Sequence, residues 1–208
     1  MLGAIIGDIV GSQYEWQEFK RKDFAFFTSA CKFTDDSLMT LAIGEAFLLR
    51  RDRWREASFQ RFVIERMIKM GREHQANSWG GNFYKWFMER PVPYGSCGNG
   101  AAMRISSVGW IAKSEEDVKH FSKLVTEVSH DHPEGLRGAE AVAMAIYLAR
   151  EGFSIEHIRE RMIEYYPKIK DMTVDKIRPT YGIDGLGAFI TCQGSVPEAI
   201  VCFLESVS

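Results

Sequence analysis

Apolar side chains recur along most of this chain at the three- and four-residue spacing that places them on one face of a helix. The spacing predicts helices over residues 2–11, 38–48, 56–73, 79–90, 115–128, 136–150 and 154–166, with a further helix opening from a glycine-rich loop at 95–109. A last helix is predicted within residues 192–204, beginning at the Ser-x-Pro-Glu boundary of Ser195. No segment gives a convincing strand, residues 167–191 are less regular, and neither repeats nor a linker interrupt the pattern. The chain is therefore predicted to form one all-α domain over residues 1–208.

One predicted helix is apolar on all sides and begins with an acidic cluster. Thr34, Asp35, Asp36 and Ser37 precede the apolar run at 38–48, and a helix that is apolar all round is a buried helix. Two explanations fit the cluster. One is helix capping, for which a single oxygen-bearing residue is enough. The other is a hard cation such as Mg²⁺, which takes oxygen ligands and offsets the cost of carboxylates near a core.

The first predicted helix carries glycines at a regular spacing. Gly3, Gly7 and Gly11 recur every four residues and so share one face, although each lowers helix propensity by about 1 kcal/mol relative to alanine. We therefore expect another backbone to pack closely against this face. Asp8 lies in the same apolar segment. Because a buried carboxylate needs hydrogen-bond partners, we interpret it as a structural anchor rather than a catalytic group.

A glutamate follows this helix on a turn. Glu15 lies between Tyr14 and Trp16 in the sequence. A carboxyl group against aromatic rings can have a raised pKa and can act as a general acid or base. A solvated loop glutamate is the structural alternative.

A glycine-rich loop and two histidines are further candidate ligand sites. The segment GSCGNGAAMR at 95–104 exposes backbone N–H groups that can cradle phosphate or sugar hydroxyls. A tight turn with a helix cap explains it equally well, and it matches neither the P-loop nor the dinucleotide fingerprint. His130 and His132 lie just before a helix that begins near Pro133, without a third metal ligand nearby in sequence. Ligand contact or loop-fixing hydrogen bonds are therefore favoured over zinc.

Composition narrows the class of partner. The net charge is −2, with 26 Lys and Arg against 28 Asp and Glu, so no overall basic field attracts nucleic acid or an anionic membrane. No apolar run is long enough to cross a bilayer. The four cysteines form no Cys-x-x-Cys pair, and the N-terminus lacks the features of a secretion signal, so we expect a reducing, cytoplasmic location.

Five segments of the chain resemble the ADP-ribosylglycohydrolase family, which includes dinitrogenase reductase-activating glycohydrolase and the ADP-ribosylarginine and ADP-ribosylserine hydrolases. The segments are LGAIIGDIVGSQYEW, FTDDSLMTLAIGEAFL, GSCGNGAAMR, SHDHPEGLRGAEAVA and CQGSVPEAIVCFLES, in the family's order from residue 2 to about residue 206. Five motifs in sequence over nearly the whole chain are a specific signal.

The resemblance implies an all-α fold with two Mg²⁺ ions near its centre and gives roles to particular residues. Thr34, Asp35 and Asp36 match the family's first set of metal ligands. Glu15 matches a glutamate implicated in catalysis or substrate gating in the serine-specific branch. The loop and the segment that contact ADP-ribose in relatives correspond here to Gly98, Asn99, Gly100, Met103 and His130.

One departure from the family pattern concerns the remaining metal ligands. Family members continue into a glycine-rich segment ending in Asp-x-Asp-Thr or Asp-x-Asp-Ser, and this sequence ends before that segment. Residues 181–191 are also longer than the family spacing. We therefore expect a C-terminally truncated domain whose residues supply only about half of the roughly six oxygens that Mg²⁺ prefers.

The resemblance predicts Mg²⁺-dependent hydrolysis of the bond that joins C1″ of ADP-ribose to an arginine or serine side chain, or to a small acceptor. The predicted catalytic residues are Glu15, which would move protons, and Asp36, which would hold metal. The expected partner is an ADP-ribosylated protein or a small ADP-ribosyl compound. The rival hypothesis, favoured by the missing acidic motif, is a protein on the same scaffold that binds ADP-ribose or a nucleotide without cleaving it, or is purely structural.

Overall fold

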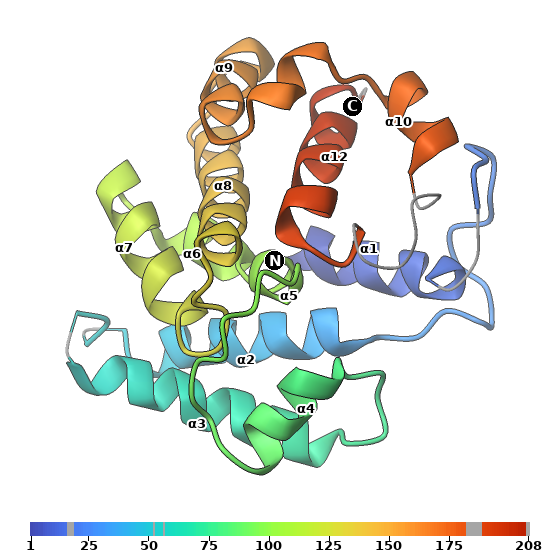
Figure 1. The fold of residues 1–208 in the computed structure, drawn as a ribbon. Coiled ribbons are helices and arrows are strands. Elements are labelled where there is room, and N and C mark those ends of the chain that lie inside the picture. The colour runs from blue at the N-terminus through green and yellow to red at the C-terminus, as the bar shows by residue number, and fades with distance from the viewer. Residues whose placement is uncertain (16–18, 52, 56, 182–188, 207–208) are drawn as a thin grey trace.

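The computed structural model describes residues 1–15, 19–51, 53–55, 57–181 and 189–206, and the regular elements in these ranges are helices (Figure 1). They are α1 (Leu2–Gly11), α2 (Asp35–Leu49), α3 (Ala57–Glu73), α4 (Gly81–Met88), α5 (Gly100–Met103), α6 (Ser106–Ile111), α7 (Glu115–Thr126), α8 (Pro133–Arg150), α9 (Ile155–Tyr165), α10 (Val174–Thr180) and α12 (Cys192–Leu204), with 3₁₀ turns η1 (Ser12–Tyr14) and η2 (Pro167–Asp171). Within the described ranges, strand-like pairing is limited to one antiparallel bridge between Gly98 and Thr191. The all-α prediction is confirmed.

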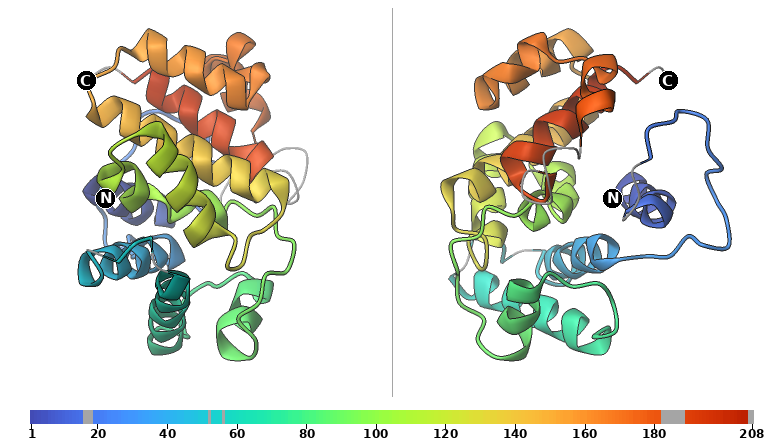
Figure 2. Two further views of the ribbon diagram at one scale, coloured as in Figure 1. Left: turned by 90° about the vertical axis from the view of Figure 1, so that its left-hand side faces the viewer. Right: turned by 45° about the vertical axis from the view of Figure 1, so that its right-hand side comes forward.

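Helix α8 is the main centre of packing among the described helices. It contacts α5, α6, α7, α9 and α12, and Figures 1 and 2 show these helices grouped around it. Its buried positions are largely small, including Gly138, Ala139, Ala141 and Ala143. Small side chains let neighbouring helices approach closely. At Gly109 of α6, for example, a Cβ would lie only 2.6 Å from Cβ of Ile146 on α8.

Helix α2 forms a second centre of packing. Met39, Ile43 and Phe47 recur every four residues and are at most 1% exposed. They lie in the same core as Phe59 and Val63 of the adjoining α3. Burial of this apolar stripe agrees with the sequence prediction, although the solvent-facing positions include Leu41, Leu48 and Leu49.

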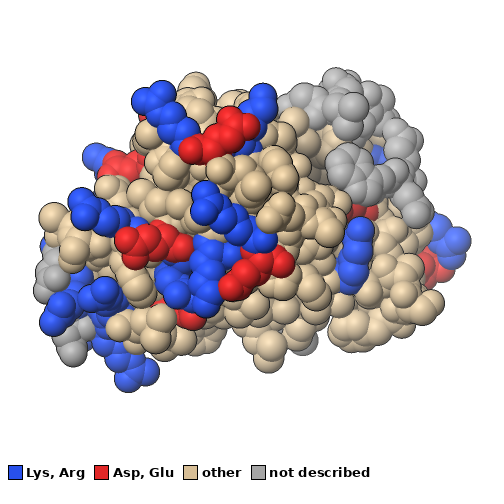
Figure 3. Space-filling model, turned by 90° about the horizontal axis from the view of Figure 1, so that it is seen from below, with Lys and Arg blue, Asp and Glu red and all other residues tan. Residues whose placement is uncertain are grey.

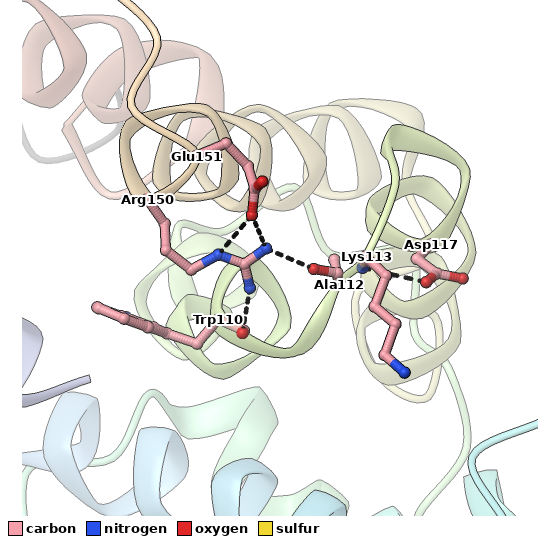
Figure 4. A network of polar contacts seen from close by, with 6 residues as sticks. All are labelled: Trp110, Ala112, Lys113, Asp117, Arg150 and Glu151. Atoms are coloured by element: carbon pink, nitrogen blue, oxygen red, sulfur yellow. Dashed lines mark hydrogen bonds and ion pairs between the residues drawn. The ribbon is translucent and has the colours of Figure 1, made fainter.

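A polar network joins α6, α7 and α8 at one end (Figure 4). Arg150, the last residue of α8, donates from Nη2 to the carbonyl oxygen of Ala112 at 2.7 Å and from Nη1 to that of Trp110. The final carbonyls of a helix have no partners within it, so the guanidinium supplies donors that the end of α6 needs. Glu151 pairs with the same guanidinium, and Asp117 of α7 accepts from the backbone N–H of Lys113.

Helix α1 departs from the packing predicted for it. No neighbouring atom of the described residues lies within 4 Å of a Cβ built on Gly3, Gly7 or Gly11. The expectation that a second backbone covers this face was therefore wrong for the described chain. Helix α1 packs on α2 (Figure 2), and of its residues only Val10 is buried. The glycine positions instead leave the adjoining space open.

The C-terminal third is more regular than the sequence indicated. Residues 167–191 include η2 and α10, while residues 182–188 of the segment judged long for the family lie outside the described residues. Helix α12 begins at Cys192, before the predicted boundary at Ser195, and so contains Pro197. Proline cannot donate to the carbonyl four residues earlier. Lys168 supplies that bond, because its Nζ lies 3.0 Å from the carbonyl oxygen of Gln193.

Acidic, basic and uncharged residues are interspersed on the surface of the protein. On the face shown in Figure 3, acidic side chains lie among the basic ones. None of the described helices has both the length and the apolar composition that would let it cross a lipid bilayer.

The anchor predicted at Asp8 is present. Its Oδ2 accepts from the backbone N–H of Thr34 at 2.8 Å and of Ser37 at 3.1 Å, and from the Ser37 hydroxyl. Its Oδ1 accepts from the Thr34 hydroxyl at 2.6 Å. Every partner is a donor, so an ionised carboxylate satisfies this position and ties α1 to the start of α2.

We predict that Asp8→Asn lowers the free energy of unfolding by about 1–3 kcal/mol, because the new amide would place N–H donors against the donors of Thr34 or Ser37. Urea denaturation of the two proteins measures the difference. The matched control is Asp23→Asn, at an exposed aspartate that pairs with Arg21 two residues away, and it should leave the midpoint unchanged. An Asp8→Asn protein as stable as the wild type would contradict the anchor.

Candidate functional site

A cleft of about 1120 Å³ opens where α1, the starts of α2 and α4, the loop before α5 and residues 189–190 meet. Its lining contains every residue to which the family resemblance gives a role: Glu15, Thr34, Asp35, Asp36, Gly98, Asn99, Gly100, Met103 and His130. These residues come from four separate parts of the chain. Tertiary packing therefore brings the acidic cluster, the glycine-rich loop and the histidine into one space. His132 lies outside this lining and caps α8, because its Nδ1 accepts from the backbone N–H of Glu134 at 3.1 Å.

The acidic part of the cleft lies at the N-terminus of α2. Thr34 is the N-cap residue, and its hydroxyl oxygen accepts from the backbone N–H of Asp36 at 3.3 Å. Capping, one of the two explanations for this cluster, is thus done by the threonine. The carboxylates of Asp35 and Asp36 are not needed for it.

Burial makes the ionised forms of the Asp35 and Asp36 side chains energetically unfavourable. Burial raises the pKa of Asp35 to about 7, and the neighbouring charge of Asp36 adds to the rise. Burial also raises the pKa of Asp36 to about 6, with further contributions from Asp8 and Glu15. Partial burial raises the pKa of Glu15 as well, against the opposing effect of Lys32. Burial and the neighbouring carboxylates therefore both disfavour the charged forms of these groups.

The donor chemistry fits one side of a hard-cation site. Thr34, Asp35 and Asp36 present only oxygen atoms, and a divalent cation would relieve the repulsion between the two carboxylates. Across the ranges that the structure describes, however, no three His, Cys, Asp or Glu side chains converge as a metal-binding group. The residues present would accordingly hold part of a coordination shell.

The glycine-rich loop forms a second wall of the cleft. Asn99 is tied to the segment before α12, because its backbone N–H donates to the carbonyl of Ile190 at 2.8 Å and its side-chain amide donates to that of Phe189 at 3.2 Å. At Gly100, an added Cβ would lie 3.0 Å from Nε2 of His130. Gly95 adopts a φ of 67°, which favours glycine. The loop is thus shaped by contacts on both sides.

His130 lies beneath this loop and is 4% exposed. Its Nδ1 is 2.8 Å from the Ser129 hydroxyl, and the rings of Tyr94 and Phe83 lie beside it, with centroids at 5.6 and 6.3 Å. Burial and the charge of Arg104 lower the pKa of His130 well below its usual value. The imidazole is therefore neutral at pH 7.

Arg104 was not among the predicted site residues, yet it lines the cleft and is fully buried. Its Nη2 donates to the Ser129 hydroxyl at 2.8 Å, and its Cζ lies 5.5 Å from the centroid of Phe83. Its Nε and Nη1 have no partner among the described residues. Burial lowers its pKa to about 10. The available signal was an arginine one turn into a small-residue helix, where a charge is rarely accommodated.

The sequence matches the ADP-ribosylglycohydrolase family over residues 1–205. Similar proteins include the ADP-ribosylhydrolase ARH3 of Bos taurus, 23% identical over 99% of this chain and 71% of the relative. Those of Mus musculus and Homo sapiens are 23% and 25% identical over 99% of this chain, which covers 70% and 72% of their lengths. The match over nearly the whole chain shows that this protein belongs to the ADP-ribosylglycohydrolase family.

Proposed function

We propose that this protein hydrolyses ADP-ribose from an ADP-ribosylated arginine or serine side chain, or from a small ADP-ribosyl compound, in an Mg²⁺-dependent reaction. One observation carries the proposal: a single cleft combines the carboxylates of the α2 N-terminus with the glycine-rich loop and His130. The relatives named ADP-ribosylhydrolase support the same reaction class.

Thr34, Asp35 and Asp36 would hold the cation in this proposal. When bound, Mg²⁺ acts as a Lewis acid that lowers the pKa of a coordinated water, and its coordination orients ribose hydroxyl groups. The buried carboxylates also favour positive charge near them. A transition state with oxocarbenium character at C1″, as in glycoside hydrolysis generally, would gain from that environment.

The remaining residues would bind the ligand and move the proton. The N–H groups of Gly98 and Asn99 already donate to the Ser96 hydroxyl and to the Ile190 carbonyl. The loop would therefore offer other backbone N–H groups, and His130 its neutral imidazole, to phosphate or ribose oxygens. Glu15 lines the same cleft on the turn after α1. Its carboxylate would take a proton from the attacking water as C1″ separates from the acceptor atom. The oxygen of water then becomes the new hydroxyl at C1″ of ADP-ribose, and Glu15 would pass the proton that it took to the departing acceptor atom, which returns the carboxylate to its starting state.

We predict that Asp36→Asn reduces Mg²⁺-dependent release of ADP-ribose on the order of 100-fold, because a neutral amide replaces an anionic metal ligand. The assay follows free ADP-ribose from ADP-ribosylated serine and arginine peptides, with circular dichroism to confirm folding. Asp171→Asn is the matched control, since Asp171 is exposed at the end of η2 and outside the cleft lining. Full activity of Asp36→Asn would overturn the metal assignment.

A separate prediction concerns proton transfer. Glu15→Gln should lower kcat by about 100-fold or more while leaving the Kd for ADP-ribose within about threefold, because the amide retains shape but cannot accept the proton. Glu160→Gln, at an exposed position of α9, should match the wild type in both measurements. Unchanged kcat, or a loss confined to binding, would exclude Glu15 as the base.

A non-catalytic ADP-ribose-binding protein is the second candidate, favoured because the described residues lack a converging group of three metal ligands. Calorimetry with ADP-ribose, with and without Mg²⁺, distinguishes the two when combined with the peptide assay. The proposed hydrolase should release ADP-ribose only when Mg²⁺ is present. Tight binding that is independent of Mg²⁺, together with no release from either peptide, would establish the binding protein instead.

A further inference from the structure

A chain of polar contacts runs from Arg104 through Ser129 to His130 at the base of the cleft. Nη2 of Arg104 lies 2.8 Å from the Ser129 oxygen, and that oxygen lies 2.8 Å from Nδ1 of His130. Guanidinium nitrogens have donors and no acceptor. The Ser129 oxygen must therefore accept the bond from Arg104, and its single hydroxyl proton remains to be placed.

The placement of that proton determines the tautomer of His130. Ser129 is fully buried, and no other acceptor for its hydroxyl is present among the described residues. If Nδ1 of His130 carried a proton, the serine oxygen would accept twice and its own buried proton would lack a partner, which is unfavourable. If the serine donates to Nδ1, every group is satisfied. The second arrangement puts the imidazole proton on Nε2.

Nε2 of His130 is on the side of the ring that meets the glycine-rich loop. A Cβ added to Gly100 or Gly98 would lie 3.0 or 3.6 Å from this nitrogen. His130 lines the cleft, and no hydrogen-bond partner of Nε2 exists in the described part of the chain. Neutrality of the ring, caused by burial and by Arg104, is consistent with one proton on the imidazole.

We propose that Arg104 and Ser129 are positioning residues that hold His130 as an Nε2–H donor, and that this donor binds an acceptor oxygen of ADP-ribose beside Gly98 and Gly100. The identity of the ligand rests on the proposed function, whereas the tautomer does not. Arg104 thus acts on the ligand through two other side chains.

Imidazole ¹⁵N resonances of the ¹⁵N-labelled 208-residue chain at pH 7 test the tautomer directly. The His130 signals are assigned by their loss in His130→Gln. We expect a non-protonated Nδ1 and a protonated Nε2. A protonated Nδ1, or an imidazolium with both nitrogens protonated, would overturn the proposal.

Ser129→Ala tests the positioning role. We expect the Nδ1 resonance to shift and the Kd for ADP-ribose to rise about three- to tenfold, the range of one lost hydrogen bond. The matched control is Ser107→Ala, at another buried serine whose hydroxyl has no partner among the described residues; both readouts should stay at wild-type values. Unchanged His130 resonances and affinity in Ser129→Ala would refute the role, and the wild-type spectrum decides the tautomer even if this variant does not fold.

The proposed function and the positioning role fail separately. If wild-type protein shows the Nε2–H tautomer and Ser129→Ala shifts the Nδ1 resonance, but ADP-ribose does not bind, the proposed function and the ligand assignment are wrong, while the positioning of His130 is upheld. If ADP-ribose binds and the ring carries its proton on Nδ1, the positioning role is wrong and the proposed function stands.

Discussion

The carboxylate of Asp8 fixes the N-terminus of α2, and the acidic part of the cleft depends on that contact. Helix α1 buries little apolar surface, with Val10 as its one buried residue. The hydrogen bonds of Asp8 therefore attach α1 to α2, whereas apolar packing joins the other helices. By accepting four hydrogen bonds from Thr34 and Ser37, Asp8 sets the first turn of α2. Thr34 then caps the helix, which leaves the next two carboxylates free to face the cleft.

On the side of the cleft formed by the glycine-rich loop, two glycines of α8 allow neighbouring segments to pack closely against this helix. A Cβ on Gly135 would lie 2.7 Å from the carbonyl oxygen of Ser96, and one on Gly138 would lie 2.6 Å from Cβ of Cys192. The glycine-rich loop and the start of α12 can therefore press against the first turns of α8. Thr40 adds a link between α2 and α5, because its hydroxyl donates to the carbonyl of Met103 at 3.2 Å.

Charge is distributed unevenly within the cleft. Carboxylates that burial and mutual repulsion disfavour line one part. A fully buried guanidinium, with two nitrogens that have no partner in the described part of the chain, lines another. Buried charged groups that lower the stability of the fold are typical of sites that bind charged or polar ligands. The proposed function uses both parts: the oxygen-rich end for a cation and ribose hydroxyls, and the end around His130 for ligand oxygens.

The positions of most helices and the anchoring role of Asp8 followed from the sequence alone, because apolar periodicity and the need of a buried carboxylate for donors are local properties. Helix α10 was not predicted, and the one helix expected from the glycine-rich loop is divided into α5 and α6. The motifs also placed the chain in its family. The partners of each group could not be obtained in this way, since Asp8 with Thr34, Arg104 with Ser129 and Asn99 with Phe189 are pairs separated in sequence and joined only by packing. The glycine face of α1 shows the difference: its spacing indicated close contact, whereas the tertiary structure leaves Gly7 and Gly11 in the cleft wall, because local spacing defines a face but not what lies against it.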